Sequence, residues 1–185
     1  NQEQIDAEIR LAVLENSFRP NIFAIATHTC VDTDELELLL VKNPKESLPV
    51  YWPVQGGIDF TVDESGEAVD IEYLGTATER ELTEETGIGV CRDFVRPIGA
   101  IRYETRQRDG FTEGKLLVGV AVDFCETSWR RRGMFLTDEG HEVLLATVEQ
   151  ARLVLQHNVD FRPHTESKAI FANAMIDRAL ALRTQ

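Results

Sequence analysis

Three glutamates stand close together near the middle of the chain, at Glu81, Glu84 and Glu85. A helix completes a turn every ~3.6 residues, so offsets of three and four would place these carboxylates on one side of it. Like charges at this spacing repel, but hard divalent metals prefer carboxylate oxygens and would turn them into a ligand set. The neighbouring Arg80 could hold one carboxylate in position through its planar guanidinium. By itself, the cluster fits either a metal site or a solvated helix face.

A longer pattern surrounds these glutamates. It resembles the Nudix box at every position that the box defines. These positions are Gly66, Glu72, Arg80, Glu81, Leu82, Glu84, Glu85, Gly87 and Ile88. The approach over Tyr51–Ile58 resembles the strand and double glycine that precede the box in RNA-pyrophosphohydrolase and dinucleoside-polyphosphate-hydrolase relatives, and Phe18–Asn21 resembles the opening of their first core strand.

One departure concerns the glycine of the motif. In most relatives the double glycine begins the box, whereas here an inserted loop over about residues 59–70 separates Gly57 from Glu72. Either Gly66 is the motif glycine, or Gly56 and Gly57 keep that role, and we favour the second. A glycine lets the backbone approach a metal or phosphate closely, and the Gly57 carbonyl could be a ligand. The role of Glu72 depends on this choice.

The resemblance implies a fold and an activity. The fold is an α+β, α/β/α sandwich around a mixed central sheet, with the box as loop, helix and loop. The activity is hydrolysis of a pyrophosphate bond in a nucleoside-diphosphate-linked small molecule, such as a nucleoside triphosphate, a dinucleoside polyphosphate or a nucleotide sugar, with Mg²⁺ or Mn²⁺. By position, the metal ligands would be Glu81, Glu84 and Glu85, supported by Glu72 and the Gly57 carbonyl. Arg80 would orient a glutamate, and Glu81 or Glu85 could be the general base.

Candidates outside the box are less specific. Glu139 and Glu142 flank a predicted turn and could supply an extra base, or be plain surface residues. Four basic residues lie around a predicted loop, and they could bind phosphates or only belong to a solvated loop. They are Arg102, Arg106, Arg108 and Lys115. Aromatic side chains could line a base pocket or fill the core; they are Trp52, Tyr103 and Phe111. Trp129 and Arg130–Arg132 could stack a base and bind its phosphate.

The elements that position these residues follow from periodicity and turn signals. We expect one domain over residues 1–185, with a helix over about residues 2–15 that packs on the core or forms a homodimer contact. Strands are predicted at 22–29, 36–41, 98–105, 115–124 and 142–147, and helices at 71–86, 148–156 and 166–182. A turn is predicted at Gly56–Gly57, a surface loop at 59–70 and a polar loop at 107–114.

Charge and composition narrow the partners. The chain has 185 residues, 43% of them hydrophobic, and 19 basic against 32 acidic residues give a net charge of −13. This balance argues against binding long nucleic acid or a membrane surface, but not against a small phosphorylated substrate whose charge a metal neutralises. Cys30, Cys91 and Cys125 lack zinc-binding spacing, which predicts a reduced, cytoplasmic protein. Two alternatives stay open, an RNA 5′-end pyrophosphohydrolase and a non-catalytic, nucleotide-sensing Nudix-like module.

Overall fold

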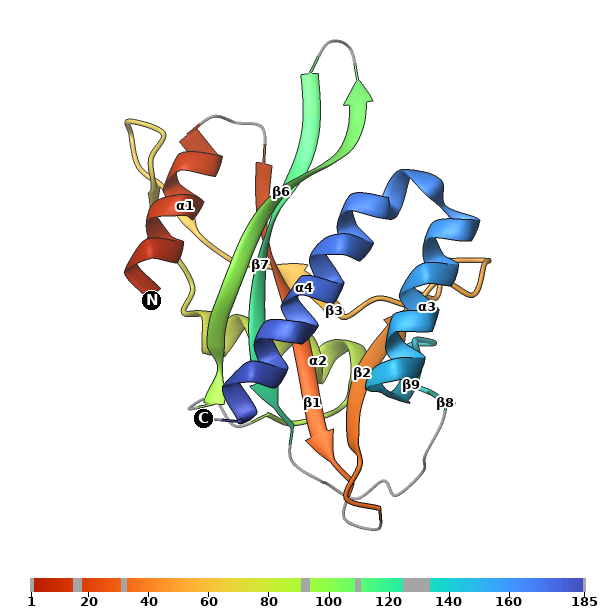
Figure 1. Cartoon of the computed structure of the whole chain (residues 1–185). Coiled ribbons are helices and arrows are strands. Elements are labelled where there is room, and N and C mark those ends of the chain that lie inside the picture. The colour runs from red at the N-terminus through yellow and green to blue at the C-terminus, as the bar shows by residue number, and fades with distance from the viewer. Residues whose placement is uncertain are drawn as a thin grey trace.

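The structure is a computed structural model that describes residues 2–14, 18–30, 33–90, 94–108, 111–124 and 134–184, with the backbone alone at 105–108, 111–113 and 134. Figure 1 shows the order of the elements along the chain. They are α1 (Gln2–Leu14), β1 (Phe18–Thr29), β2 (Leu36–Lys42), β3 (Val54–Gly57), β4 (Thr61–Val62), β5 (Ala68–Val69), α2 (Leu74–Thr86), β6 (Arg96–Arg108), β7 (Phe111–Asp123), β8 (Met134–Leu136), β9 (Glu142–Thr147), α3 (Val148–Phe161), the 3-10 helix η2 (Pro163–Thr165) and α4 (Glu166–Arg183).

Within the described residues, the main sheet has seven strands in the order β6-β7-β1-β2-β9-β8, with β3 paired to β1 outside this path. The central pair, β1 and β7, is parallel. The other pairings in this sheet are antiparallel. The predicted mixed central sheet is therefore confirmed.

Strand β1 shares one of its edges between two partners. Residues Asn21–Ala24 pair with β3, and Thr27–Thr29 pair with β2. The short β3 thus occupies only the beginning of this edge. This arrangement brings the double glycine at the end of β3 next to α2.

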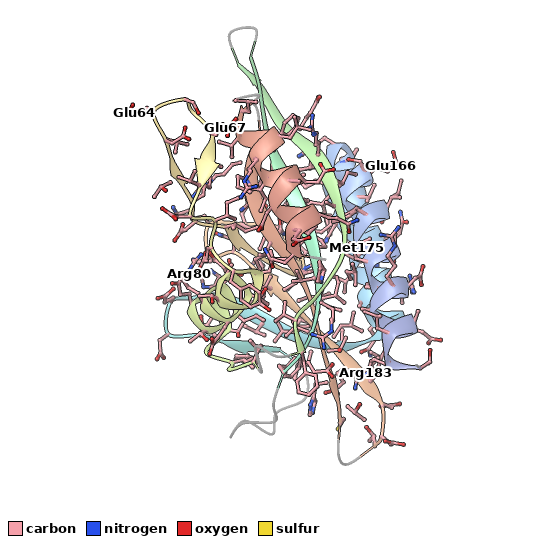
Figure 2. The ribbon with its side chains drawn as sticks, turned by 90° about the vertical axis from the view of Figure 1, so that its left-hand side faces the viewer. Glu64, Glu67, Arg80, Glu166, Met175 and Arg183 are labelled. Carbon is pink, nitrogen blue, oxygen red and sulfur yellow. The ribbon has the colours of Figure 1, made fainter. Side chains whose placement is uncertain are left out.

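Two hydrophobic cores lie on opposite faces of the sheet, as the side view in Figure 2 indicates. Alternate residues of a strand point to opposite faces, so Ile22 belongs to one core and Phe23 to the other. The first core takes buried residues from α1 and α2, and the second takes them from α3 and α4. The layers are helix, sheet and helix, which confirms the predicted sandwich.

Helix α2 buries Leu74, Ala77 and Leu82 on the side that faces the core. It ends at Gly87, whose left-handed φ of 72° suits glycine and whose N–H donates to the Thr83 carbonyl. Its predicted start at residue 71 is wrong, since the helix begins at Leu74. The residues before Leu74 are instead held by a contact across the loop, in which the Glu72 N–H donates to the Asp59 carbonyl at 2.7 Å.

Three other expectations need correction. Gly56 and Gly57 lie in strand β3 and not in a turn, because they pair with Ile22 and Asn21 of β1. The predicted surface loop at 59–70 contains an antiparallel hairpin of β4 and β5. Most of the polar loop predicted at 107–114 belongs to β6 and β7, because cross-strand backbone hydrogen bonds continue where the hydrophobic pattern stops.

The remaining elements lie close to the predicted ranges. Helix α1 covers most of residues 2–15, and β9, α3 and α4 begin at or near their predicted first residues. The short strand β8, which pairs with β9, was not predicted from the sequence. Among the helices of the described ranges, none has both the length and the apolarity needed to span a membrane.

A buried asparagine in α3 fixes the segment before β3. Asn158 is 0% exposed, and its side chain both accepts from the Tyr51 N–H at 3.0 Å and donates to the Tyr51 carbonyl. The next residue, Trp52, exchanges two backbone hydrogen bonds with Val41 in β2. Position and orientation of the Tyr51–Trp52 segment therefore depend on both α3 and β2.

We expect Asn158→Ala to lower the free energy of unfolding by about 2 kcal/mol or more, because each buried polar group left without a partner costs about 1–3 kcal/mol. Urea denaturation would measure the loss. Asn173→Ala is the matched control on α4, where the half-buried side chain donates to the Ala169 carbonyl of its own helix and accepts from Arg152 Nη1 at 3.0 Å. Equal losses in the two variants would contradict the role given to Asn158.

Candidate active site

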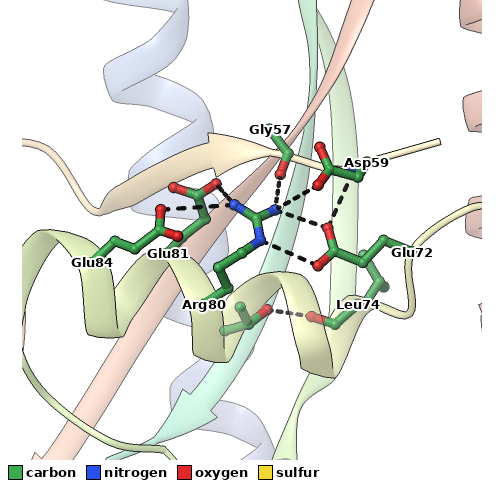
Figure 3. A network of polar contacts seen from close by, with 8 residues as sticks. Gly57, Asp59, Glu72, Leu74, Arg80, Glu81 and Glu84 are labelled. Carbon is green, nitrogen blue, oxygen red and sulfur yellow. Dashed lines mark hydrogen bonds and ion pairs between the residues drawn. The ribbon is translucent and has the colours of Figure 1, made fainter.

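The guanidinium of Arg80 lies at the centre of a network that joins α2 to β3 and to the segment before the helix (Figure 3). Its Nη2 donates to the Gly57 carbonyl and to Glu72 Oε2, both at 2.8 Å, and its Nε donates to Glu72 Oε1 at 3.3 Å. Its Nη1 donates to Glu81 Oε1 at 2.5 Å and lies 3.8 Å from Glu84 Oε2. One cation therefore positions Glu72, Glu81 and the Gly57 carbonyl, and it lies within ion-pair distance of Glu84.

These contacts change the proton affinity of the groups involved. The hydrogen bond to Glu72 is the largest of the influences that raise the pKa of Arg80. Burial acts to raise the pKa of Glu72, but hydrogen bonds from Arg80 and from the Asp59 N–H outweigh it, so the pKa lies below its ordinary value. The Arg80–Glu72 pair thus stays ionised at neutral pH.

Glu81 occupies space that only a glycine leaves open. The side chain is buried, with 8% of the residue exposed, and it lies against Gly56. A Cβ added to Gly56 would stand 1.6 Å from Glu81 Cδ and 1.8 Å from Oε2. Burial raises the pKa of Glu81, although its contact with Arg80 opposes the shift.

Glu85 lies one turn further along α2. Its carboxylate accepts a hydrogen bond from the Gln55 backbone N–H. Burial, and then the charge of Glu81, raise the pKa of Glu85 to about 7, while Lys115 acts in the opposite direction. Glu81 and Glu85 are therefore two partly buried carboxylates that disfavour each other's ionisation.

Glu85 also forms part of the wall of a cavity of about 230 Å³. The wall brings together residues from β2, the loop after it, β3, α2, β7, the segment just before β9 and α4. These residues are Val41, Asn43, Glu46, Val50, Trp52, Pro53, Gln55, Glu85, Lys115, His141 and Lys168. The cavity is a suitable place for a small polar ligand to reach the carboxylates of α2.

The donors around Glu81 and Glu85 suit a hard divalent cation, because they are carboxylate and carbonyl oxygens. A cation would also relieve the repulsion between these two carboxylates. Among the side chains that the structure describes, no three His, Cys, Asp or Glu residues are already gathered as a metal-binding group. Arg80 bonds only Oε1 of Glu81, so Oε2 is the oxygen available toward Gly56 for a metal ion.

The predicted substrate residues are divided between different places. Trp52 and Lys115 line the cavity. Arg102 instead stacks over the Phe18 ring, 5.4 Å from its centroid, and lines a groove beside α1. Tyr103 is a buried core residue. Several predicted side chains lie outside the described residues, namely Arg106, Arg108, Phe111, Trp129 and Arg130–Arg132, and so do Cys91 and Cys125.

The two candidates for an extra base differ in their surroundings. Glu139 is exposed in the turn before β9. Glu142 accepts hydrogen bonds from Lys42 Nζ at 2.6 Å and from the Tyr51 hydroxyl at 2.7 Å. The bond from Lys42, followed by that from Tyr51, lowers the pKa of Glu142.

The two glycine alternatives also differ. Gly66 has a φ of 85° in the turn between β4 and β5, and nothing lies within 4 Å of a Cβ added there. Figure 2 places the neighbouring Glu64 and Glu67 at one end of the molecule, away from Arg80. Gly57, in contrast, accepts from Arg80.

Sequence reasoning missed three contributors to this site, which are Gln55 through its backbone N–H, His141 and Lys168. Lys168 stands 83 positions after Glu85 in the sequence, on α4, with no motif around it. Because Lys168 reaches the cavity only through the packing of α4 on the sheet, no local signal could have found it.

No family model matches the sequence, and no curated protein matches it. Several solved structures are similar to it. A MutT/nudix family protein from Enterococcus faecalis is 15% identical with a TM-score of 0.49, over 71% of this chain and 44% of that one. A C. elegans Ap4A hydrolase is 12% identical with a TM-score of 0.46, over 89% of this chain and 98% of that one. The Nudix domain of Shewanella oneidensis NrtR, complexed with ADP ribose, is 14% identical with a TM-score of 0.49, over 78% of this chain and 89% of that one.

The chain therefore resembles Nudix proteins in its motif and in the solved structures to which it is similar. It spans less than half the length of the Enterococcus faecalis protein. At these identities and TM-scores, the likeness assigns neither a substrate nor the role of any residue.

We expect Gly56→Ala to lower the free energy of unfolding by about 1–3 kcal/mol, the usual cost of inserting a methyl group into a filled space. The added Cβ would displace Glu81 from its position between Gly56 and Arg80. Gly89→Ala is the matched control, because nothing lies within 4 Å of a Cβ at that position. Thermal and urea unfolding of both variants would measure the difference, and an unchanged Gly56→Ala protein would argue against this position of Glu81.

Proposed function

We propose that this chain is a divalent-metal-dependent hydrolase of the Nudix type, which cleaves a pyrophosphate bond in a nucleoside-diphosphate-linked small molecule. The observation that carries the proposal is the pairing of Glu81 and Glu85. Both carboxylates have raised pKa values, lie beside the Arg80 network, and are positioned on the helix of a complete Nudix-like motif. Buried carboxylates of this kind are characteristic of functional sites.

The metal would be held by Glu81, Glu84 and Glu85, with the Gly57 carbonyl as a further ligand. When bound, Mg²⁺ or Mn²⁺ would neutralise the diphosphate and lower the pKa of a water molecule. Glu84 is the most exposed of the three glutamates, with 57% of its side chain accessible. It can therefore turn toward a ligand at little cost in packing.

The side chains around the metal ligands would act mainly by positioning. Arg80 and Glu72 form the ion pair that holds the Gly57 carbonyl and Glu81 in place. Both oxygens of Glu72 accept hydrogen bonds from Arg80. Glu72 therefore supports the metal ligands indirectly, through Arg80. Phosphoryl substitution needs chiefly alignment and charge stabilisation, which such a rigid network supplies.

Glu85 is our candidate for the general base. It lines the cavity and accepts a hydrogen bond from the Gln55 N–H, and a carboxylate within reach of the attacking water can accept its proton. Glu142 is a weaker candidate, because hydrogen bonds from Lys42 and Tyr51 engage both its oxygens and lower its pKa, which makes it a poorer proton acceptor. The general base would abstract a proton from the attacking water and return it to solvent after the phosphorus–oxygen bond has broken.

The cavity and the charge of the chain favour a small substrate. A volume of about 230 Å³ accommodates part of a nucleotide. A net charge of −13 opposes the approach of long RNA, since nucleic-acid affinity depends strongly on cationic contacts. We therefore propose a nucleoside triphosphate, a dinucleoside polyphosphate or a nucleotide sugar as the substrate.

We expect Glu85→Gln to lower kcat by about a hundredfold or more, the usual range for loss of a general base. Glu84→Gln should reduce turnover and raise the metal concentration needed for half-maximal rate. Glu64→Gln is the matched control, since Glu64 is exposed in the β4–β5 hairpin, away from Arg80. In metal-free buffer, Glu85→Gln should be at least as stable as the parent protein, because it removes one of two repelling carboxylates. Full activity in both active-site variants would refute the metal site.

Removal of metal should abolish hydrolysis. We would incubate the protein with EDTA and assay nucleoside triphosphates, dinucleoside polyphosphates, ADP-ribose, nucleotide sugars and triphosphorylated RNA, with products separated by chromatography. Activity should return with Mg²⁺ or Mn²⁺, and added metal should raise the melting temperature of the parent protein but not that of a Glu81→Gln, Glu85→Gln double variant. Hydrolysis that persists in EDTA, or none on any substrate with metal restored, would count against the proposal.

A further inference from the structure

Two lysines from distant elements face the cavity beside Glu85. Lys115 belongs to β7 and Lys168 to α4. Lys115 is close enough to Glu85 and to Glu81 for their charges to act on it, and Lys168 in turn is influenced by Lys115. Glu85, Lys115 and Lys168 all line the same cavity, so one carboxylate and two ammonium groups share its wall.

The ammonium of Lys168 lies over two aromatic rings. Its Nζ lies 4.2 Å from the centroid of the Trp52 ring and 5.9 Å from that of Tyr103. These contacts provide cation–π attraction but no countercharge. In the part of the chain that the structure describes, no carboxylate lies within ion-pair distance of Lys168 Nζ.

The acidic groups of the cavity are already engaged elsewhere. Glu46 binds Arg162 Nη2 at 3.0 Å and the Leu48 N–H at 3.0 Å. Glu85 accepts from the Gln55 N–H. The position of Lys168 is therefore not explained by an ion pair with either of the acids that line the cavity.

The charge balance of the cavity favours an anion there. Burial, and then the charge of Lys115, lower the pKa of Lys168 to about 7. Burial and Arg19 lower that of Lys115, while Glu85 and Glu81 oppose the shift. Cations held together in this way disfavour each other, and an anion between them would remove the penalty. In addition, His141 lines the cavity and has a buried Nδ1 without a hydrogen-bond partner among the described residues.

We propose that Lys168, together with Lys115, forms a subsite for a phosphate group of the substrate that lies beyond the diphosphate held at the metal. This inference rests on the proposed function and narrows its substrate class. A substrate that fills the subsite carries at least three phosphates in a row, as nucleoside triphosphates and dinucleoside polyphosphates do. A nucleotide sugar or ADP-ribose has only two and leaves Lys168 without an anion.

The same geometry limits where the base can bind. The face of Trp52 that the Lys168 ammonium covers is not available for stacking on a base. Trp52 therefore serves to position Lys168, and the base lies outside this part of the cavity. In this arrangement Trp52 is a positioning residue.

Lys168→Met tests the subsite, because it keeps an unbranched side chain of nearly the same length and removes the charge. We expect KM for a nucleoside triphosphate or a dinucleoside polyphosphate to rise by about tenfold or more, as for loss of a charge-assisted hydrogen bond, with kcat changed much less. KM for ADP-ribose should stay within about twofold of the parent value, a change too small to correspond to such a bond. Lys45→Met, at an exposed lysine in the loop after β2, is the matched control for loss of one positive charge. Equal effects of Lys168→Met on all substrates, or none on any, would overturn the subsite.

A binding measurement separates this inference from the proposed function. Inorganic tripolyphosphate in EDTA should raise the melting temperature of the parent protein and of Lys45→Met, but not of Lys168→Met. Binding of this kind in a protein that hydrolyses nothing would refute the proposed function while supporting the subsite. Metal-dependent hydrolysis, together with tripolyphosphate binding that Lys168→Met does not change, would support the proposed function and refute the subsite. Lys168→Gln provides a second variant, should the methionine variant fold poorly.

Discussion

The interaction on which the site depends is the contact of one guanidinium with two carboxylates and a backbone carbonyl. Arg80 binds Glu72, Glu81 and Gly57 at once, and so ties together α2, β3 and the chain segment that precedes the helix. Arginine suits this role because its planar group offers several donors in a fixed geometry. Without it, Glu72 and Glu81 would lose the cation that is hydrogen-bonded to both of them.

The fold makes this network possible through the short strand β3. Pairing with the first half of β1 places the double glycine beside α2, and Gly56 leaves the space that Glu81 fills. Asn158 and Val41 fix the residues just before β3, so helices and strands far apart in the sequence determine where Trp52 lies. The site thus depends on the whole sandwich and not only on the motif.

Charge is distributed unevenly in a chain that is acidic overall. Glu85 of α2 lines the cavity, and so do Lys115 of β7 and Lys168 of α4. Burial raises the pKa of Glu85 and lowers that of Lys168, so both groups carry less charge than they would in water. A ligand of opposite charge would therefore stabilise each kind of group, a metal cation at the glutamates and an anion at the lysines.

The sequence by itself determined the helix that carries the glutamates, its end at Gly87, and the mixed α+β class. These features depend on local spacing, helix capping and hydrophobic periodicity, which are properties of neighbouring residues. Only the tertiary structure decided that Gly56 and Gly57 lie in a strand, that Arg102 points to a groove beside α1, and that Lys168 reaches the cavity. These depend on strand pairing and on the packing of α4 against the sheet, and such long-range contacts leave no periodic signal in the chain.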